Sequence, residues 1–162
     1  MCNENRACVK GAEVKWRQQV AFLTAGWDGR RVGAGGTWLD TEFDPGLAGR
    51  ERDDFMLPRA SKHVYTAHIG YEKAGFSTRL AAVYRSEYLD TLGDSAAYDI
   101  YVAPNTQLDV SLDYNITANV SVYLEAQNLL DKPLELYQGT RSRTLQMEEY
   151  GRTYALGLKV AL

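Results

Sequence analysis

Long apolar runs are missing from this sequence, and their absence excludes one common architecture. No uninterrupted apolar stretch approaches the roughly 18 residues that a membrane-spanning helix needs. A membrane strand needs only about 9–11 residues, of which every second one is apolar, so the sequence is still compatible with a membrane. An excess of basic charge is missing too, because 18 Lys and Arg are balanced by 21 Asp and Glu. This balance argues against a nucleic-acid-binding surface.

Cysteine, histidine and proline are also scarce. The only cysteines, Cys2 and Cys8, allow either a local disulfide in an oxidising compartment or two unpaired thiols. The only histidines, His63 and His68, fall on opposite faces of a strand and therefore do not converge on one site. We expect no catalytic, cofactor-binding or metal-binding residues, and no enzyme activity. Four prolines against 14 glycines and 11 tyrosines favour an all-β chain.

What the sequence has is alternation of apolar and polar residues with a period of two. Residues 107–116 show it most clearly, and residues 120–127 repeat it after a tight turn at 116–119. The same pattern runs through residues 9–23, 31–42, 62–72, 76–88 and 150–162. We therefore predict about seven long strands in an antiparallel up-and-down meander.

The connections and the two faces favour a wide membrane barrel over a soluble sheet. Tight turns are expected near 25–30, 73–75 and 116–119, and long solvated loops at 43–60, 89–104 and 129–147. Aromatic residues are expected near the strand ends on the apolar face, as an interfacial girdle. These are Tyr65, Tyr71, Phe76, Tyr84, Tyr88, Tyr114 and Tyr154. The opposite face carries charges that suit a wet lumen. They are Glu13, Lys15, Arg17, Glu72, Arg79, Arg85, Asp109, Asp113, Glu125 and Lys159.

Two alternatives are weaker. A small autonomous outer-membrane barrel with a structural or adhesive role would need an even number of strands, usually eight or more, whereas we count about seven. A soluble ligand-binding β protein would bury a dry interior, which the charged face contradicts.

Several segments resemble a known family. Residues 128–133 (Asn-Leu-Leu-Asp-Lys-Pro) follow an alternating strand, and residues 148–158 lead into the last one. Together they resemble the C-terminal strands of TonB-dependent receptors. Residues 9–13 with Gln18 and Gln19, and residues 37–42, look like earlier strands of the same barrel. The resemblance covers residues 6–162, and Leu162 departs from it, because such barrels usually end in an aromatic residue.

The resemblance implies the architecture and the function. Residues 1–162 would be the C-terminal segment of a 22-stranded transmembrane barrel, without the plug domain and the earlier strands. The function would be energy-coupled uptake of a bulky solute, a siderophore, vitamin or oligosaccharide, across the cell outer membrane. The implied partners are outer-membrane lipid, the remaining barrel strands, the plug, the TonB energy-coupling complex through the missing N-terminal part, and a small-molecule substrate. No nucleic acid is implied.

Candidate substrate contacts lie in the long segments. Tyr101, Tyr137 and Arg141 are the candidates, together with Asp99 and Gln138, because tyrosines and polar groups at a barrel mouth suit sugars or siderophores. The charged segment 44–54 is expected to be a solvated, mobile loop. Residues 128–131 are expected to have a structural role, with Asn and Asp side chains bonded to nearby backbone. Gly33, Gly35, Gly36 and Gly157 are expected to allow bending or close packing in the wall.

The sequence predicts how this chain behaves when it is expressed alone. Unpaired strand edges are costly in lipid and adhesive in water, so the isolated chain should aggregate or need detergent, and it should not form a conducting pore. Size-exclusion chromatography and planar-bilayer recording test this. A monodisperse detergent-free monomer that unfolds cooperatively would contradict the prediction.

Overall fold

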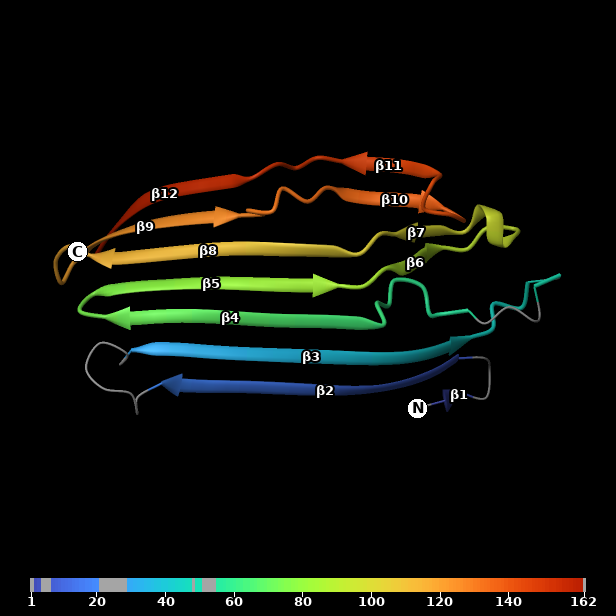
Figure 1. Cartoon of the computed structure of the whole chain (residues 1–162), viewed down its shortest axis with the longest axis horizontal. Helices are drawn as coiled ribbons and strands as arrows, with labels where there is room; N and C mark the ends of the chain where they lie inside the picture. The colour runs from blue at the N-terminus through green and yellow to red at the C-terminus, as the bar shows by residue number, and fades with distance from the viewer. Residues whose placement is uncertain (1, 4–6, 21–28, 48, 51–54, 162) are drawn as a thin grey trace.

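A sheet of long antiparallel strands is the largest element of the computed structural model, which describes residues 2–3, 7–20, 29–47, 49–50 and 55–161. The sheet order is β1-β2-β3-β4-β5-β8-β9-β12 (Figure 1). Apart from the two-residue β1, its strands are β2 (Ala7–Val20), β3 (Arg30–Phe43), β4 (His63–Lys73), β5 (Phe76–Arg85), β8 (Asn105–Asn115), β9 (Val120–Gln127) and β12 (Thr153–Val160). The prediction of seven long strands is confirmed.

The strand register confirms the separation of the two faces. Residues directly opposite each other in an antiparallel pair share a face. One such row is Arg17, Gly33, His68, Ala81 and Asp109, from β2 to β8. Following the pairing across the sheet places all ten predicted charges on this polar face.

The apolar face has no protein layer packed over it. Large side chains along it are exposed, among them Trp16, Ile69, Leu156 and Leu158, the last two at 74% and 67%. The chain exposes 11267 Å², whereas a compact monomer of its mass would expose about 8,100 Å². The buried hydrophobic residues of the described part are few, and all except Ala126 lie outside the large sheet. The large sheet is a single layer, called the wall below. Its apolar face is stable only in contact with an apolar environment.

Aromatic residues gather at both ends of the apolar face. Towards the long connections, Tyr65 stacks on Tyr84 with ring centroids 5.9 Å apart, and Trp38 meets Tyr65 edge-on. At the opposite end, Tyr71 packs beside Phe76, which lies opposite Tyr114. Two belts of this kind suit the two interfaces of a bilayer. The assignment of Tyr88 to the girdle is wrong, because Tyr88 belongs to a second sheet, which is described below. The Arg85 guanidinium lies over its ring, 4.7 Å from the ring centroid.

Tight turns join the long strands at one edge of the wall (Figure 1). Between β4 and β5, Ala74 and Gly75 have φ values of 52° and 80°, as a two-residue hairpin turn requires. β8 and β9 are joined through residues 116–119, also as predicted. Most of the expected 25–30 turn, and residues 21–23 of the strand predicted over 9–23, lie outside the described residues.

A second sheet, called the outer sheet below, lies beyond the ends of the long strands that are opposite the tight turns (Figure 1). It shows that the prediction of solvated loops is partly wrong. It contains β6 (Tyr88–Thr91), β7 (Ile100–Val102), β10 (Leu134–Gln138) and β11 (Thr144–Glu148) in the order β11-β10-β7-β6. A short 3₁₀ turn, η1 (Ala96–Tyr98), precedes β7. Segments 89–104 and 129–147 are therefore partly ordered strand pairs. Strands of three to five residues are too short to show a period of two, and for this reason the sequence did not reveal them.

Two smaller features complete the fold. Cys8 is disulfide-bonded, so the alternative of two unpaired thiols is wrong, and β1 (Cys2–Asn3) pairs with β2 with Cys2 opposite Cys8 in the register. Within the described residues, no helix is both long enough and apolar enough to span a membrane.

Two adjacent alanines test the assignment of the faces. Ala81 lies on the polar face and Ala82 on the apolar face, both in the middle of β5. In the full barrel in phospholipid vesicles, Ala82→Arg should lower the free energy of unfolding by about 2–4 kcal/mol, because an arginine would face hydrocarbon. Ala81→Arg is the matched control, and its cost should stay below about 1 kcal/mol because the side chain reaches water. Guanidinium titration followed by tryptophan fluorescence measures both. Equal costs for the two variants would show that the faces are misassigned.

Candidate functional site

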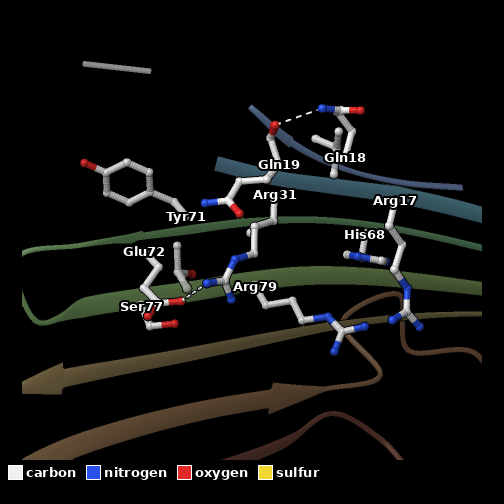
Figure 2. Close-up of a pocket in the computed structure, with 12 residues that line it drawn as sticks. Arg17, Gln18, Gln19, Arg31, His68, Tyr71, Glu72, Ser77 and Arg79 are labelled. Carbon is white, nitrogen blue, oxygen red and sulfur yellow. Dashed lines mark hydrogen bonds and ion pairs between the residues drawn. The ribbon is translucent and has the colours of Figure 1, made fainter. Parts of the chain in front are cut away.

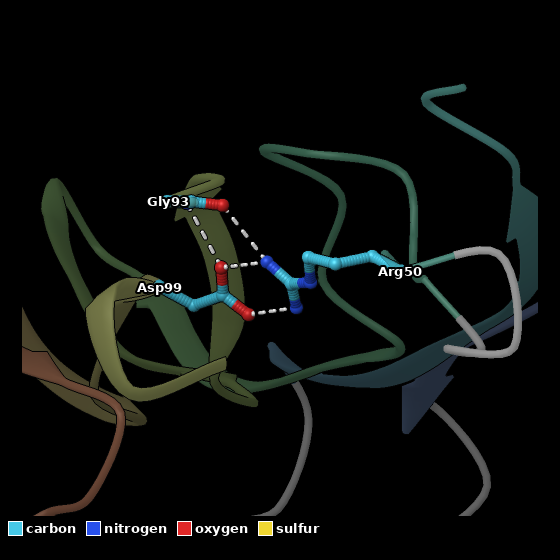
Figure 3. A network of polar contacts seen from close by, with 3 residues as sticks. All are labelled: Arg50, Gly93 and Asp99. Atoms are coloured by element: carbon cyan, nitrogen blue, oxygen red, sulfur yellow. Dashed lines mark hydrogen bonds and ion pairs between the residues drawn. The ribbon is translucent and has the colours of Figure 1, made fainter. Parts of the chain in front are cut away.

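The outer sheet is anchored by a buried ion pair. Both guanidinium Nη atoms of Arg50 donate to the Asp99 carboxylate at 2.7 Å, and the Gly93 N–H donates to the same carboxylate at 2.9 Å (Figure 3). Arg50 and Asp99 are only 7% and 2% exposed. The Arg50 guanidinium also lies 4.5 Å from the Phe55 ring centroid. The expectation that segment 44–54 is a solvated loop is therefore wrong at Arg50, while residues 48 and 51–54 lie outside the described part.

The ion pair fixes the charge state of Asp99. Burial alone would raise the pKa of this carboxyl, but the hydrogen bonds from Arg50 and from the Gly93 N–H outweigh it, so the pKa is lowered. A carboxyl whose pKa falls on folding stabilises the protein above its unfolded pKa of about 3.9. That stabilisation is lost as the pH falls through the folded pKa. The pair therefore holds the segment before β4 against the segment before β7 at neutral pH.

The three predicted contact residues meet around Glu87. Tyr101 and Tyr137 stack with ring centroids 5.3 Å apart. The Tyr137 hydroxyl donates to Glu87 at 3.0 Å, and Arg141 donates to the same oxygen at 2.6 Å. The hydrogen bond from Arg141 is the main cause of the lowered pKa of Glu87, and burial is the main cause of the raised pKa of Tyr137. Tyr137 is 6% exposed, so its ring packs the outer sheet and leaves little surface for a solute.

Other predicted residues have structural roles. Gln138 accepts a hydrogen bond from Arg143 at 3.0 Å. Asn128 has a φ of 54° and bonds through its amide to the Lys132 N–H and to the Gly151 carbonyl, which confirms its predicted backbone role. Close packing at the wall glycines is confirmed as well, since a Cβ at Gly157 would overlap the Tyr123 ring. Among the described residues, no three His, Cys, Asp or Glu side chains gather as a metal site would require.

Two cavities lie along the polar face. The upper cavity, near the outer sheet, measures about 440 Å³ and is lined by amides, an aromatic ring and two cationic side chains, among them Gln107, Tyr150 and Arg85. The lower cavity, near the tight turns, measures about 450 Å³, and its lining includes Arg17, Arg31 and Arg79 (Figure 2). Neither was found from the sequence, because the strands that build each cavity are adjacent only after pairing. Tyr150, which is 69% exposed, joins Tyr101 and Arg141 as a candidate for solute contact.

Removal of Arg50 tests the anchor. Arg50→Leu leaves the Asp99 carboxylate buried without its partner, which costs about 3–5 kcal/mol. Amides of β7 and β10 should then exchange hydrogen at least about 100-fold faster. The matched control is Arg59→Leu, which breaks the exposed 3.2 Å pair with Asp90 and should cost about 0–1 kcal/mol. Equal protection of β7 in both variants would refute the anchoring role.

Comparison with known proteins identifies a family for this chain. The family model described as "TonB dependent receptor-like, beta-barrel" matches residues 2–129. That match ends before residues 148–158, which carried much of the resemblance in the sequence. A search among curated proteins returned no match.

Two solved structures share the fold. The siderophore receptor PiuA from Acinetobacter baumannii is 20% identical, with a TM-score of 0.70 over 95% of this chain and 22% of its own length. The ferric citrate transporter FecA in its unliganded form is 14% identical, with a TM-score of 0.71 over 94% of this chain and 24% of its own length. This chain thus spans about a quarter or less of each. It belongs to the TonB-dependent receptor β-barrel family of outer-membrane proteins.

Proposed function

We propose that this chain forms the last seven strands of a 22-stranded outer-membrane barrel that imports a bulky solute by energy-coupled transport. In this proposal residues 1–162 are the C-terminal segment of the barrel domain, and the earlier strands and the plug belong to the same receptor. The chain supplies part of the wall and part of the outer mouth, and it carries out no bond chemistry.

The single observation that carries the proposal is the exposed apolar face opposite a charged face. A wall of this kind is stable only with lipid on one side and water on the other. The charged face would then line a wet lumen, which a barrel of about 22 strands encloses and a barrel of about eight does not. The pairing of the described strands also ends at β1 and β12 without joining them. Further strands at both edges would satisfy their backbone groups.

The outer end of the wall supports a solute-binding role. The upper cavity offers amide and phenol groups, and the outer sheet holds its loops in place through the Arg50–Asp99 and Glu87–Arg141 pairs. Ordered polar groups at the mouth suit a large oxygen-rich solute. A ferric siderophore is the first candidate, because one structural relative is described as a siderophore receptor and another as a ferric citrate transporter. A vitamin or an oligosaccharide is the alternative.

The other partners follow from the same proposal. The lumen would hold a plug domain, and the plug would pass the force of the TonB energy-coupling complex to the bound solute. The apolar face would contact outer-membrane lipid. None of the described residues of this chain would contact TonB, because that contact belongs to the N-terminal part of the receptor.

Solute uptake in cells tests the proposal. Cells in which the codons for residues 1–162 are deleted should lose uptake of at least one solute from a set of radiolabelled ferric siderophores, cobalamin and maltooligosaccharides. Complementation with the intact gene should restore uptake, and dissipating the proton-motive force should abolish it. Unchanged uptake of the whole set in the deletion strain, or uptake that persists without the proton-motive force, would overturn the proposed function.

A further inference from the structure

We propose that the lower cavity of the polar face binds the oxyanion group, a carboxylate or a phosphate, of a solute that crosses the barrel. The site is distinct from the outer mouth, because it lies next to the tight turns of β4 and β5. The inference rests on the proposed function in one respect, since it takes the polar face to be the lumen wall.

The floor of the site is a glycine between two arginines. In the register, Arg31 on β3 lies opposite Gly70 on β4, and Gly70 lies opposite Arg79 on β5. The two arginine Cα atoms are therefore two strand spacings, about 10 Å, apart. A Cβ at Gly70 would lie 3.3 Å from the backbone oxygen of Thr78 and 3.9 Å from that of Arg31. Apart from the two chain neighbours, no side-chain atom of the described residues lies within 4 Å of this position, so a small anion has room between the two guanidinium groups.

One row further along, the same arrangement recurs with a histidine. Arg17 lies opposite Gly33, and Gly33 lies opposite His68. A Cβ at Gly33 would overlap the His68 imidazole, so the ring leans over this glycine towards β2. Arg17 and His68 line the same cavity as Arg31 and Arg79 (Figure 2). Four side chains that can donate hydrogen bonds therefore line the cavity in two pairs, and one glycine separates the members of each pair. Gly70 is open, whereas the His68 ring covers Gly33.

The cavity has an excess of positive charge. Among the described residues that line it, Glu72 is the one carboxylate, and it pairs with Arg31 at 2.9 Å. Three guanidinium groups against one carboxylate leave a formal charge of +2, although the whole chain has a net charge of −3. Guanidinium groups bind carboxylate and phosphate oxygens through paired hydrogen bonds. A water-filled lumen with low-dielectric walls would strengthen the attraction of this patch for anions.

The neighbouring part of the wall has the opposite character. On β8 and β9 the polar face carries Asp109, Asp113 and Glu125, of which Asp113 is paired with Lys159 at 2.9 Å. An anion in the lumen would therefore be drawn towards β2–β5 and away from β8–β9. The separation of basic and acidic side chains on the polar face therefore favours anion binding at one part of the wall over the other.

Arginine footprinting of the full-length receptor in detergent tests the site. Phenylglyoxal modifies free guanidinium groups, and peptide mass spectrometry reads each arginine separately. With about 10 mM inorganic phosphate or succinate, Arg31 and Arg79 should react about three-fold more slowly, as one-site binding with a Kd of about 5 mM requires. Arg59, which lies in the connection before β4 and pairs with Asp90, lines neither cavity, so it should react at an unchanged rate and is the internal reference.

A variant tests whether the two arginines share one anion. In Arg79→Gln, the protection of Arg31 should fall towards one-fold, whereas in the control Arg59→Gln it should remain about three-fold. Circular dichroism checks that each variant keeps its strands. Three results would overturn the inference: no protection by either anion, equal protection of Arg59, or protection that is already complete without added anion. The last result would assign the arginines to a carboxylate elsewhere in the receptor. The footprint needs no transport, so a failure of the uptake test leaves it readable.

Discussion

Lateral hydrogen bonding between strands in a place without water is the constraint on which this structure depends. Backbone N–H and C=O groups that face hydrocarbon must be paired inside the protein, and a sheet meets this requirement only through its neighbours. The seven long strands are paired in an unbroken antiparallel order, and the turns between them lie at one edge. In a paired sheet, alternate side chains point to opposite faces. One face can therefore contact lipid while the other contacts water. The exposed apolar face and the aromatic belts are consequences of this arrangement.

The outer sheet is stabilised differently, because it lies beyond the long strands and has no lipid to cover its apolar side chains. Its strands are short, and its apolar core is small, with Phe55, Leu89, Val102 and Tyr137 as its buried hydrophobic members. Charged groups add what the core lacks. Arg50 and Asp99 form a buried bidentate pair, and Glu87 accepts hydrogen bonds from Tyr137 and Arg141. Both clusters join segments that are about 50 residues apart in the sequence, and this order at the mouth preorganises the surface that a solute would meet.

The polar face combines a uniform pattern with local differences in charge. Every second residue of each long strand contributes to it, yet guanidinium groups gather on β2–β5 and carboxylates on β8–β9. The open Gly70 deepens the basic part, whereas the His68 ring covers Gly33 and a tyrosine ring covers Gly157. The polar face therefore varies along the wall in both charge and depth. The family match establishes the kind of barrel, and these local features are where this chain would express a preference for particular solutes.

The sequence alone determined the number of long strands, the two faces, the tight turns at 73–75 and 116–119 and the family resemblance, because these depend on patterns that are visible in local order. It also determined the backbone role of Asn128, since an amide can bond to groups a few residues away. Only the tertiary structure decided the outer sheet, the burial of Arg50, the meeting of Tyr137 with Glu87 and the open floor at Gly70 between two arginines. Each of these depends on which distant segments become neighbours, and strand register, which no short stretch of sequence encodes, decides that.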